Sequence, residues 1–193
     1  MKSKVVTWVA VLLVLAEVLL VLLSWLLSAT MAENVRSLLS SEGIRWFMGS
    51  FVLFMQSQVL IWILLLSMAY GCVRRVLFSA SDSRQHRRAA WQISLLFLAL
   101  YVGTILMLTV VPHAVLISAT GHLFPSPFSQ ALVPIIAFGV MALSVVYGIS
   151  VRLFRSLGDV VNALLSGIAA SAPVLFLYVL FMQFYESLRF VFF

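Results

Sequence analysis

Residues 11–25 read VLLVLAEVLLVLLSW and contain one ionisable side chain, Glu17. They lie in a longer apolar segment, residues 5–27, which as a helix would cross about 30 Å of hydrocarbon at about 1.5 Å per residue. Of the 193 residues in the chain, 64% are hydrophobic and 9% are charged, whereas soluble domains have about 25% charged residues. The composition therefore excludes a water-soluble fold and predicts an all-α membrane protein.

Four further apolar segments have similar lengths, so we predict a polytopic helical bundle of about five transmembrane helices in one integral membrane domain. The predicted spans are residues 5–27, 51–72, 91–111, 132–151 and 160–184. The first segment is too long for the apolar core of a signal peptide, and we interpret it as a retained span. The single cysteine, Cys72, excludes an intramolecular disulfide framework.

The basic residues are divided unequally between the two sides that these spans define. One side would hold nine of them: Lys2, Lys4, Arg74, Arg75, Arg84, Arg87, Arg88, Arg152 and Arg155. The other side would hold three: Arg36, Arg45 and Arg189. Because positive charge is enriched on the cytoplasmic side, we predict an inner-membrane protein with its N-terminus in the cytoplasm and its C-terminus outside.

The positions of the basic residues also indicate which partners to expect. They lie in short loops beside the spans, so we expect contact with the lipid bilayer and no binding of nucleic acid. The C-terminal tail, residues 185–193, could lie on the outer surface or turn back into a cavity of the protein.

The segment between the first two spans carries helical signals. Thr30 and Glu33 have the spacing of a capping box. The apolar residues that follow recur at helical spacing; they are Val35, Leu38 and Leu39. This pattern predicts a short amphipathic helix that lies in the outer interface.

The next stretch, LLSSEGIRW at residues 38–46, contains signals for the start of another helix. Ser40 and Ser41 are candidate N-caps, and Glu42 would lie in the first turn, where a negative charge is favourable. The same stretch resembles the segment after the first span in the p-aminobenzoyl-glutamate transporter (AbgT) family, in which the pattern Leu-Leu-Ser-x-Glu-Gly-Ile/Leu-Arg-Trp recurs.

A second stretch, SAPVLFLYVLFMQFYESL at residues 171–188, is similar to a late segment of the same family. The similarity places Gln183 and Phe184 on the family's Gln-Phe pair. The preceding SLGDVVNALLSG resembles the charged stretch before that segment, with Asp159 and Val160 in the matching places.

The resemblance implies ion-coupled transport of an organic anion or a drug. We expect the chain to form an oligomer, because five spans enclose little space. Family members are over twice as long and have two re-entrant hairpins that help to form the substrate site. No counterpart of those hairpin sequences occurs here, so we expect a much shortened member that lacks most of the transport core. An alternative therefore stays open: a non-transporting subunit of a larger complex that uses the transporter-like scaffold to bind other transmembrane helices.

Glu17 is the most unusual candidate site residue. An ionised side chain at the centre of the bilayer costs about 2.5–3.5 kcal/mol, so it must face protein or water, or be protonated. Counted from the outer ends of the spans, Glu17 lies within about 5 Å of the depth of Gln56 and Gln58. We predict either an ion or substrate pathway or an interhelical polar clasp for this set, together with Asn162 near the inner end of the fifth span.

The stretch SGIAASAP, residues 166–173, predicts a helix-packing face. Its members are Ser166, Gly167, Ala170, Ser171 and Pro173. Two pairs of small residues lie four positions apart, which lets another helix approach closely, and the proline would bend the span. A moving, broken helix of a transporter is the alternative interpretation.

Catalytic and metal-binding signals are weak. The chain has no Gly-x-Ser-x-Gly and no His-Glu-x-x-His sequence, and Asp82 and Asp159 are both predicted in loops. His113 and His122 have no carboxylate or thiol at ligand spacing. We therefore expect no enzyme activity, no cofactor and no metal site.

Overall fold

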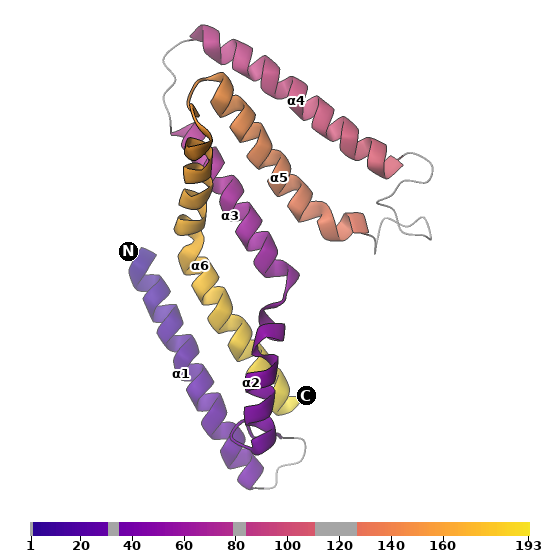
Figure 1. The fold of residues 1–193 in the computed structure, drawn as a ribbon. Helices are drawn as coiled ribbons and strands as arrows, with labels where there is room; N and C mark the ends of the chain where they lie inside the picture. The colour runs from indigo at the N-terminus through magenta and orange to yellow at the C-terminus, as the bar shows by residue number, and fades with distance from the viewer. Residues whose placement is uncertain (1, 31–34, 79–83, 111–126) are drawn as a thin grey trace. The chain divides into compact units, whose positions relative to one another are not determined.

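The computed structural model describes residues 2–30, 35–78, 84–110 and 127–193, which form six α-helices and no strand. The helices are α1 (Lys2–Ala29), α2 (Ser41–Met55), α3 (Gln58–Leu77), α4 (Arg84–Val110), α5 (Pro127–Ser150) and α6 (Leu157–Phe192) (Figure 1). The predicted all-α class is confirmed. Glu33, Asp82, His113 and His122 lie outside the described residues.

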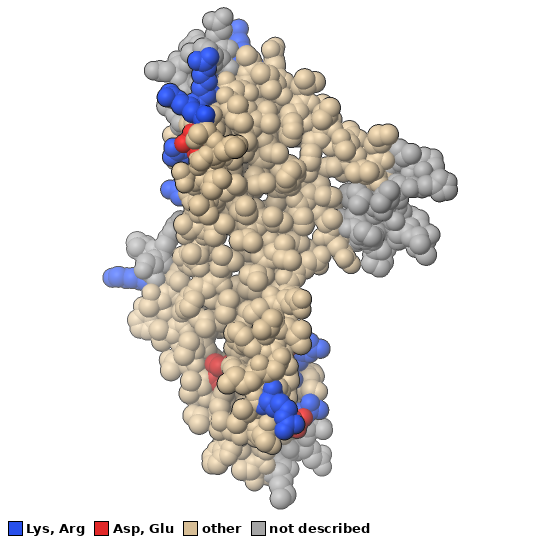
Figure 2. Space-filling model, viewed as in Figure 1, with Lys and Arg blue, Asp and Glu red and all other residues tan. Residues whose placement is uncertain are grey.

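Every helix except α2 is long and apolar enough to cross a membrane. These five helices overlap the five predicted spans. Large apolar side chains lie on the outside of the protein, and on α1 the exposed fraction of Trp8 is 75%. Figure 2 shows a surface that is almost entirely uncharged, with lysine and arginine side chains gathered in small clusters. Such a surface matches a hydrocarbon environment.

The chain divides into two compact units. Unit 1 comprises Met1–Ile61 and Ala172–Phe193, and unit 2 comprises Trp62–Ser171. Helices α3 and α6 each contribute residues to both units.

The core of unit 1 joins α1, the connector before α2 and the C-terminal end of α6. Its buried apolar residues are Leu20, Leu38, Phe190 and Val191. The Trp46 ring stacks on the Phe190 ring with centroids 4.3 Å apart. Helix α6 thus continues through the C-terminal tail to Phe192, and burial of Phe190 and Val191 stabilises this continuation.

Residues 35–39, predicted to belong to an amphipathic helix, are not helical. The backbone N–H of Arg36 donates to the Val191 carbonyl at 3.1 Å, and that of Leu38 donates to Ser24 Oγ at 3.2 Å. Since these donors are bonded to distant segments, they are not available for the ladder of a local helix.

Helix α2 begins where the sequence signals place it. Ser40 is the N-cap, and its Oγ accepts a hydrogen bond from the Gly43 N–H at 3.0 Å. A Cβ at Gly43 would lie 2.5 Å from the Ser37 carbonyl oxygen, so the tight turn requires a glycine there. Glu42 lies in the first turn, as predicted.

The predicted second span, residues 51–72, is interrupted. Helix α2 ends at Met55 and α3 begins at Gln58, because the Gln56 backbone leaves the helical region at φ −78° and ψ 51°. Ser57 Oγ is hydrogen-bonded to the Tyr178 hydroxyl of α6, and it also accepts from the Leu60 N–H at the start of α3. A tertiary contact and a new cap therefore stabilise the break.

In unit 2, α4 packs along α5 (Figure 1). Helix α5 ends in a Schellman motif, in which the Leu153 N–H donates to the Gly148 carbonyl and the Arg152 N–H donates to the Ile149 carbonyl. Arg152 occupies the left-handed position with φ 58°. The chain then turns so that Phe154 is buried in a core with Cys72.

Two side chains cap the start of α6 reciprocally. Asp159 Oδ2 accepts the backbone N–H groups of Arg155 and Ser156, each at 3.0 Å, while Ser156 Oγ accepts the Asp159 N–H at 3.3 Å. Ser156 and Asp159 thus form a capping box, whose sequence signal is a serine followed three residues later by an acidic residue.

Candidate functional site

Three polar side chains meet inside unit 1, between α1 and the C-terminal half of α6. Ser187 Oγ donates to Glu17 Oε1 at 2.6 Å, and Gln183 Nε2 donates to Ser187 Oγ at 3.1 Å. Ser187 is fully buried. We name Glu17, Gln183 and Ser187 the polar cluster; its donors form a chain directed at the carboxylate.

The polar cluster contains two oxygen atoms without a donor. Glu17 Oε2 and Gln183 Oε1 are both buried and have no hydrogen-bond partner among the residues that the structure describes. Leaving a buried acceptor unpaired costs about 1–3 kcal/mol, and more for a charged group. A proton on the carboxylate, a water molecule or a small cation would satisfy these atoms.

A cavity of about 190 Å³ lies beside the carboxylate. It is lined by Glu17, Val21, Leu38, Leu39, Ile44, Phe47 and Met48. Since a water molecule occupies about 30 Å³ in the liquid, the volume is sufficient for a few waters. Glu17 is the one ionisable group among these lining residues. The polar cluster therefore lies beside a space large enough for water, with the carboxylate in its wall.

The hydrogen-bond partner of Glu17 is Ser187 on α6 in place of the predicted glutamines of the second span. Gln56 and Gln58 flank the break between α2 and α3, and both are exposed. Asn162 is exposed near the beginning of α6 and belongs to unit 2. The polar cluster thus contains Glu17 and none of the other three residues predicted with it.

Sequence reasoning did not assign Ser187 or Gln183 to this site. The two residues lie four positions apart on α6, so they occupy one face of the helix. That spacing of two polar residues in an apolar segment was the available signal. It identifies a polar face but not the helix that meets it.

The small residues of the predicted packing face have different environments. Gly167 is buried in unit 2, where a Cβ would lie 2.0 Å from the Ser67 carbonyl oxygen of α3. A Cβ at Gly71 would lie 2.2 Å from the Ala163 carbonyl oxygen of α6. The two helix backbones therefore touch, and each brings a pair of small residues four positions apart. We name Ser67, Gly71, Ala163 and Gly167 the glycine crossing.

The remaining members of that face do not take part in the glycine crossing. Ser166 and Ala170 are exposed, and Ser171 is half-buried with its Oγ donating to the Ile168 carbonyl of its own helix. Pro173 is exposed inside α6, which is assigned as one helix from Leu157 to Phe192.

Comparison with known proteins gives one match. A family model described as "AbgT putative transporter family" matches residues 75–190, more than half of the chain. The match includes α4, α5 and most of α6, and with them Gln183 and Ser187. No curated protein and no solved structure matches the chain.

Proposed function

The chain belongs to the AbgT transporter family, and from that premise we propose that it carries out ion-coupled transport of an organic anion or a drug across the inner membrane. It is a multi-pass membrane protein, with five helices long and apolar enough to span the bilayer. The single observation that carries this function is the family match over residues 75–190.

We assign the coupling ion to Glu17. An ionisable side chain within a membrane span is a functional candidate by default, because its burial is costly. Two features of unit 1 support the assignment: the unpaired Glu17 Oε2 and the cavity of about 190 Å³ beside it. A single carboxylate balances one positive charge, so we propose a proton or a monovalent cation.

Reconstituted transport tests this function. The purified full chain is placed in liposomes with an imposed proton or sodium gradient, and uptake of p-aminobenzoyl-glutamate, the solute after which the family is named, is measured. We expect gradient-driven uptake by the unchanged protein and at least a tenfold loss in Glu17→Gln. The amide can still accept from Ser187 but cannot bind a proton or balance a cation.

The matched control is Glu42→Gln, which removes the same charge from the exposed first turn of α2. It should retain full uptake. Uptake that is equal in Glu17→Gln and the unchanged protein would exclude Glu17 as the ion site while leaving the transport function intact.

Native mass spectrometry of the protein, purified gently from its own membranes, addresses the alternative of a non-transporting subunit. We propose a homo-oligomer, because five spans enclose little space. A stoichiometric second protein, together with no uptake in liposomes, would contradict the transport proposal and support the subunit.

For the topology, we propose a cytoplasmic N-terminus, supported by the excess of basic residues on one side of the predicted spans. Arg155→Cys and Arg45→Cys lie on opposite sides in this arrangement. A membrane-impermeant maleimide added to intact cells should label Arg45→Cys and not Arg155→Cys. The native Cys72 is buried and should contribute little background. The reverse labelling pattern would show that the N-terminus lies outside.

A further inference from the structure

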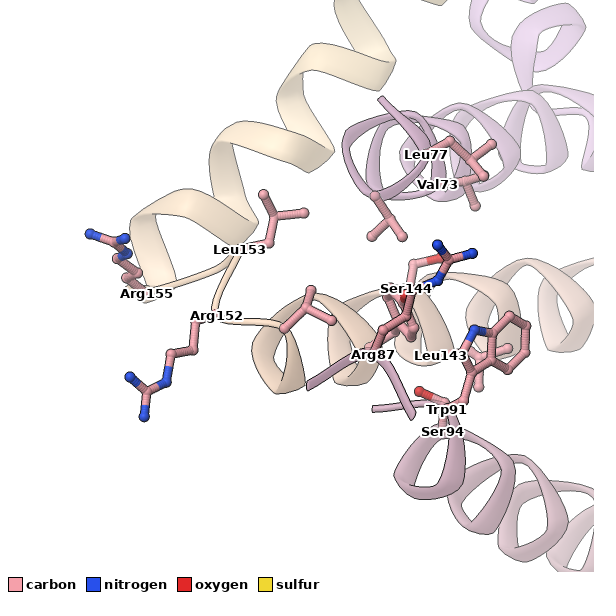
Figure 3. A pocket seen from close by; sticks show the side chains of 13 residues that line it. Val73, Leu77, Arg87, Trp91, Ser94, Leu143, Ser144, Arg152, Leu153 and Arg155 are labelled. Carbon is pink, nitrogen blue, oxygen red and sulfur yellow. The ribbon is translucent and has the colours of Figure 1, made fainter. Parts of the chain in front are cut away.

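Unit 2 contains a large cavity at the helix ends where its basic residues lie. Its volume is about 1040 Å³. Figure 3 shows that Arg87, Trp91 and Ser94 come from α4, whereas Val73 and Leu77 come from α3. Arg152 and Arg155 come from the connection between α5 and α6. We name it the basic cavity.

The basic cavity is lined by positive charge without a compensating carboxylate. Three arginines and no acidic residue occur among its described lining residues. The nearby Asp159 carboxylate is engaged by backbone N–H groups at the cap of α6. Within the part of the chain that the structure describes, no ion pair involves Arg87, Arg152 or Arg155. The Arg87 guanidinium, which lies among the other lining side chains, is therefore available to an anion, whereas Figure 3 shows the Arg152 and Arg155 side chains directed away from the cavity.

A buried hydroxyl in the wall of the basic cavity also has no partner. The exposed fraction of Ser94 is 4%, and within the described part of the chain its Oγ has no hydrogen bond. Ser144 lines the same cavity from α5, but its Oγ donates to the Val140 carbonyl of its own helix at 2.7 Å. Ser94 thus differs from its neighbour in having an unused donor and acceptor at the wall of the cavity.

The groups on α4 change in character along the helix. Arg87, Trp91 and Ser94 lie on one face, and about 10 Å of helix axis separates the first from the last. Trp91 meets Tyr147 edge-on, with ring centroids 5.9 Å apart. Aliphatic side chains complete the wall, among them Val73, Leu77 and Leu143. The order is charge, aromatic ring and polar group beside an apolar surface, as at the edge of a bilayer.

We propose that the basic cavity binds one molecule of an anionic phospholipid. Its phosphate would contact Arg87, the Ser94 hydroxyl would donate to an ester oxygen, and an acyl chain would lie along the aliphatic wall. Basic pockets between transmembrane helices are known to take such head groups. The inference does not depend on transport, because it rests on the charge and the unpaired hydroxyl of unit 2.

Native mass spectrometry of the full chain in detergent tests this inference. The protein is titrated with phosphatidylglycerol and, separately, with phosphatidylcholine of the same acyl chains. We expect one retained phosphatidylglycerol and at least tenfold weaker retention of phosphatidylcholine. Arg87→Gln and Ser94→Ala should each weaken phosphatidylglycerol binding about fivefold, through loss of one charge contact or one hydrogen bond.

Two matched variants separate a built site from general surface attraction. Arg74→Gln removes an exposed charge from the end of α3, and Ser150→Ala removes a hydroxyl bonded within α5; neither residue lines the cavity. Both should bind like the unchanged protein. If Arg87→Gln does not fold, Ser94→Ala at the same cavity carries the test.

Several outcomes would overturn the proposal. Equal retention of the two lipids, or an equal loss in Arg74→Gln and Arg87→Gln, would reduce the effect to non-specific attraction. Displacement of the lipid by p-aminobenzoyl-glutamate, which has no acyl chain, at equal concentration would identify a solute site instead. Unaltered binding in both Arg87→Gln and Ser94→Ala would place the lipid elsewhere.

Discussion

Helix α6 meets one partner helix through polar groups in unit 1 and another through bare backbone in unit 2. At the polar cluster, Ser187 joins it to Glu17 of α1 and two oxygen atoms are left unpaired. At the glycine crossing, Gly167 lies against α3 so closely that a Cβ has no room. In hydrocarbon, helices associate through close packing or polar contacts, because apolar side chains gain little from one another. The polar cluster keeps unpaired oxygen atoms that could bind a further group, whereas the glycine crossing has no such atoms and contributes packing alone.

The largest expected effect is a break of the glycine crossing. Gly167→Leu would place a side chain where a Cβ alone lies 2.0 Å from the Ser67 carbonyl oxygen. We expect a loss of about 3 kcal/mol or more in the free energy of unfolding, measured in mixed micelles. Gly103→Leu is the control, since a Cβ there would meet no atom within 4 Å apart from the nearby backbone of its own helix. Equal losses in the two variants would contradict a backbone contact.

A smaller effect is expected from the buried hydroxyl that supports the connector in unit 1. Ser24→Ala removes the acceptor of the Leu38 N–H and leaves that donor buried. The free energy of unfolding should fall by about 2 kcal/mol. Ser150→Ala should change it little, because the Ser150 hydroxyl bonds only to the Val146 carbonyl of its own helix. Hydrogen exchange at the Leu38 amide should become faster in the first variant alone.

The contribution of the polar cluster itself is expected to be smaller still. A double-mutant cycle of Glu17→Ala and Ser187→Ala should give a coupling free energy of about 1 kcal/mol, in the range of polar contacts between membrane helices. The same cycle with Gln56→Ala in place of Ser187→Ala should give a value near zero, because Gln56 is exposed. A coupling free energy that is larger for Glu17 with Gln56 than for Glu17 with Ser187 would support the predicted clasp between the first two spans.

The smallest effect concerns the cap of α5. Arg152 adopts φ 58°, where glycine has no Cβ penalty, so Arg152→Gly should stabilise the protein by about 0.5 kcal/mol. Arg155→Gly should destabilise it by a similar amount, since Arg155 is not among the residues with positive φ. Thermal unfolding of the two variants gives the sign. If both Arg152→Gly and Arg155→Gly lowered the unfolding temperature, the left-handed conformation of Arg152 would not limit the stability of unit 2.

Much of the architecture follows from local properties of the chain. The all-α class and the presence of five membrane-spanning helices follow from apolar segments whose length matches the hydrocarbon thickness. Ser40 caps α2 as expected, because an N-cap involves only the next three residues. The family resemblance depends on two short stretches; the family match over residues 75–190 includes the stretch at 171–188 but not the stretch at 38–46, and it adds α4 and α5.

Only the tertiary structure decided which polar groups meet. Ser187 is 170 positions from Glu17, and the contact depends on how α1 and α6 are rotated against each other. The break at Gln56 and the non-helical connector at residues 35–39 also depend on contacts with α6. Hydropathy averaged over a span determines that a helix crosses the membrane, but not which neighbour its polar face bonds. That choice is made by packing, because most buried donors and acceptors are paired, and for these spans distant segments supply the partners.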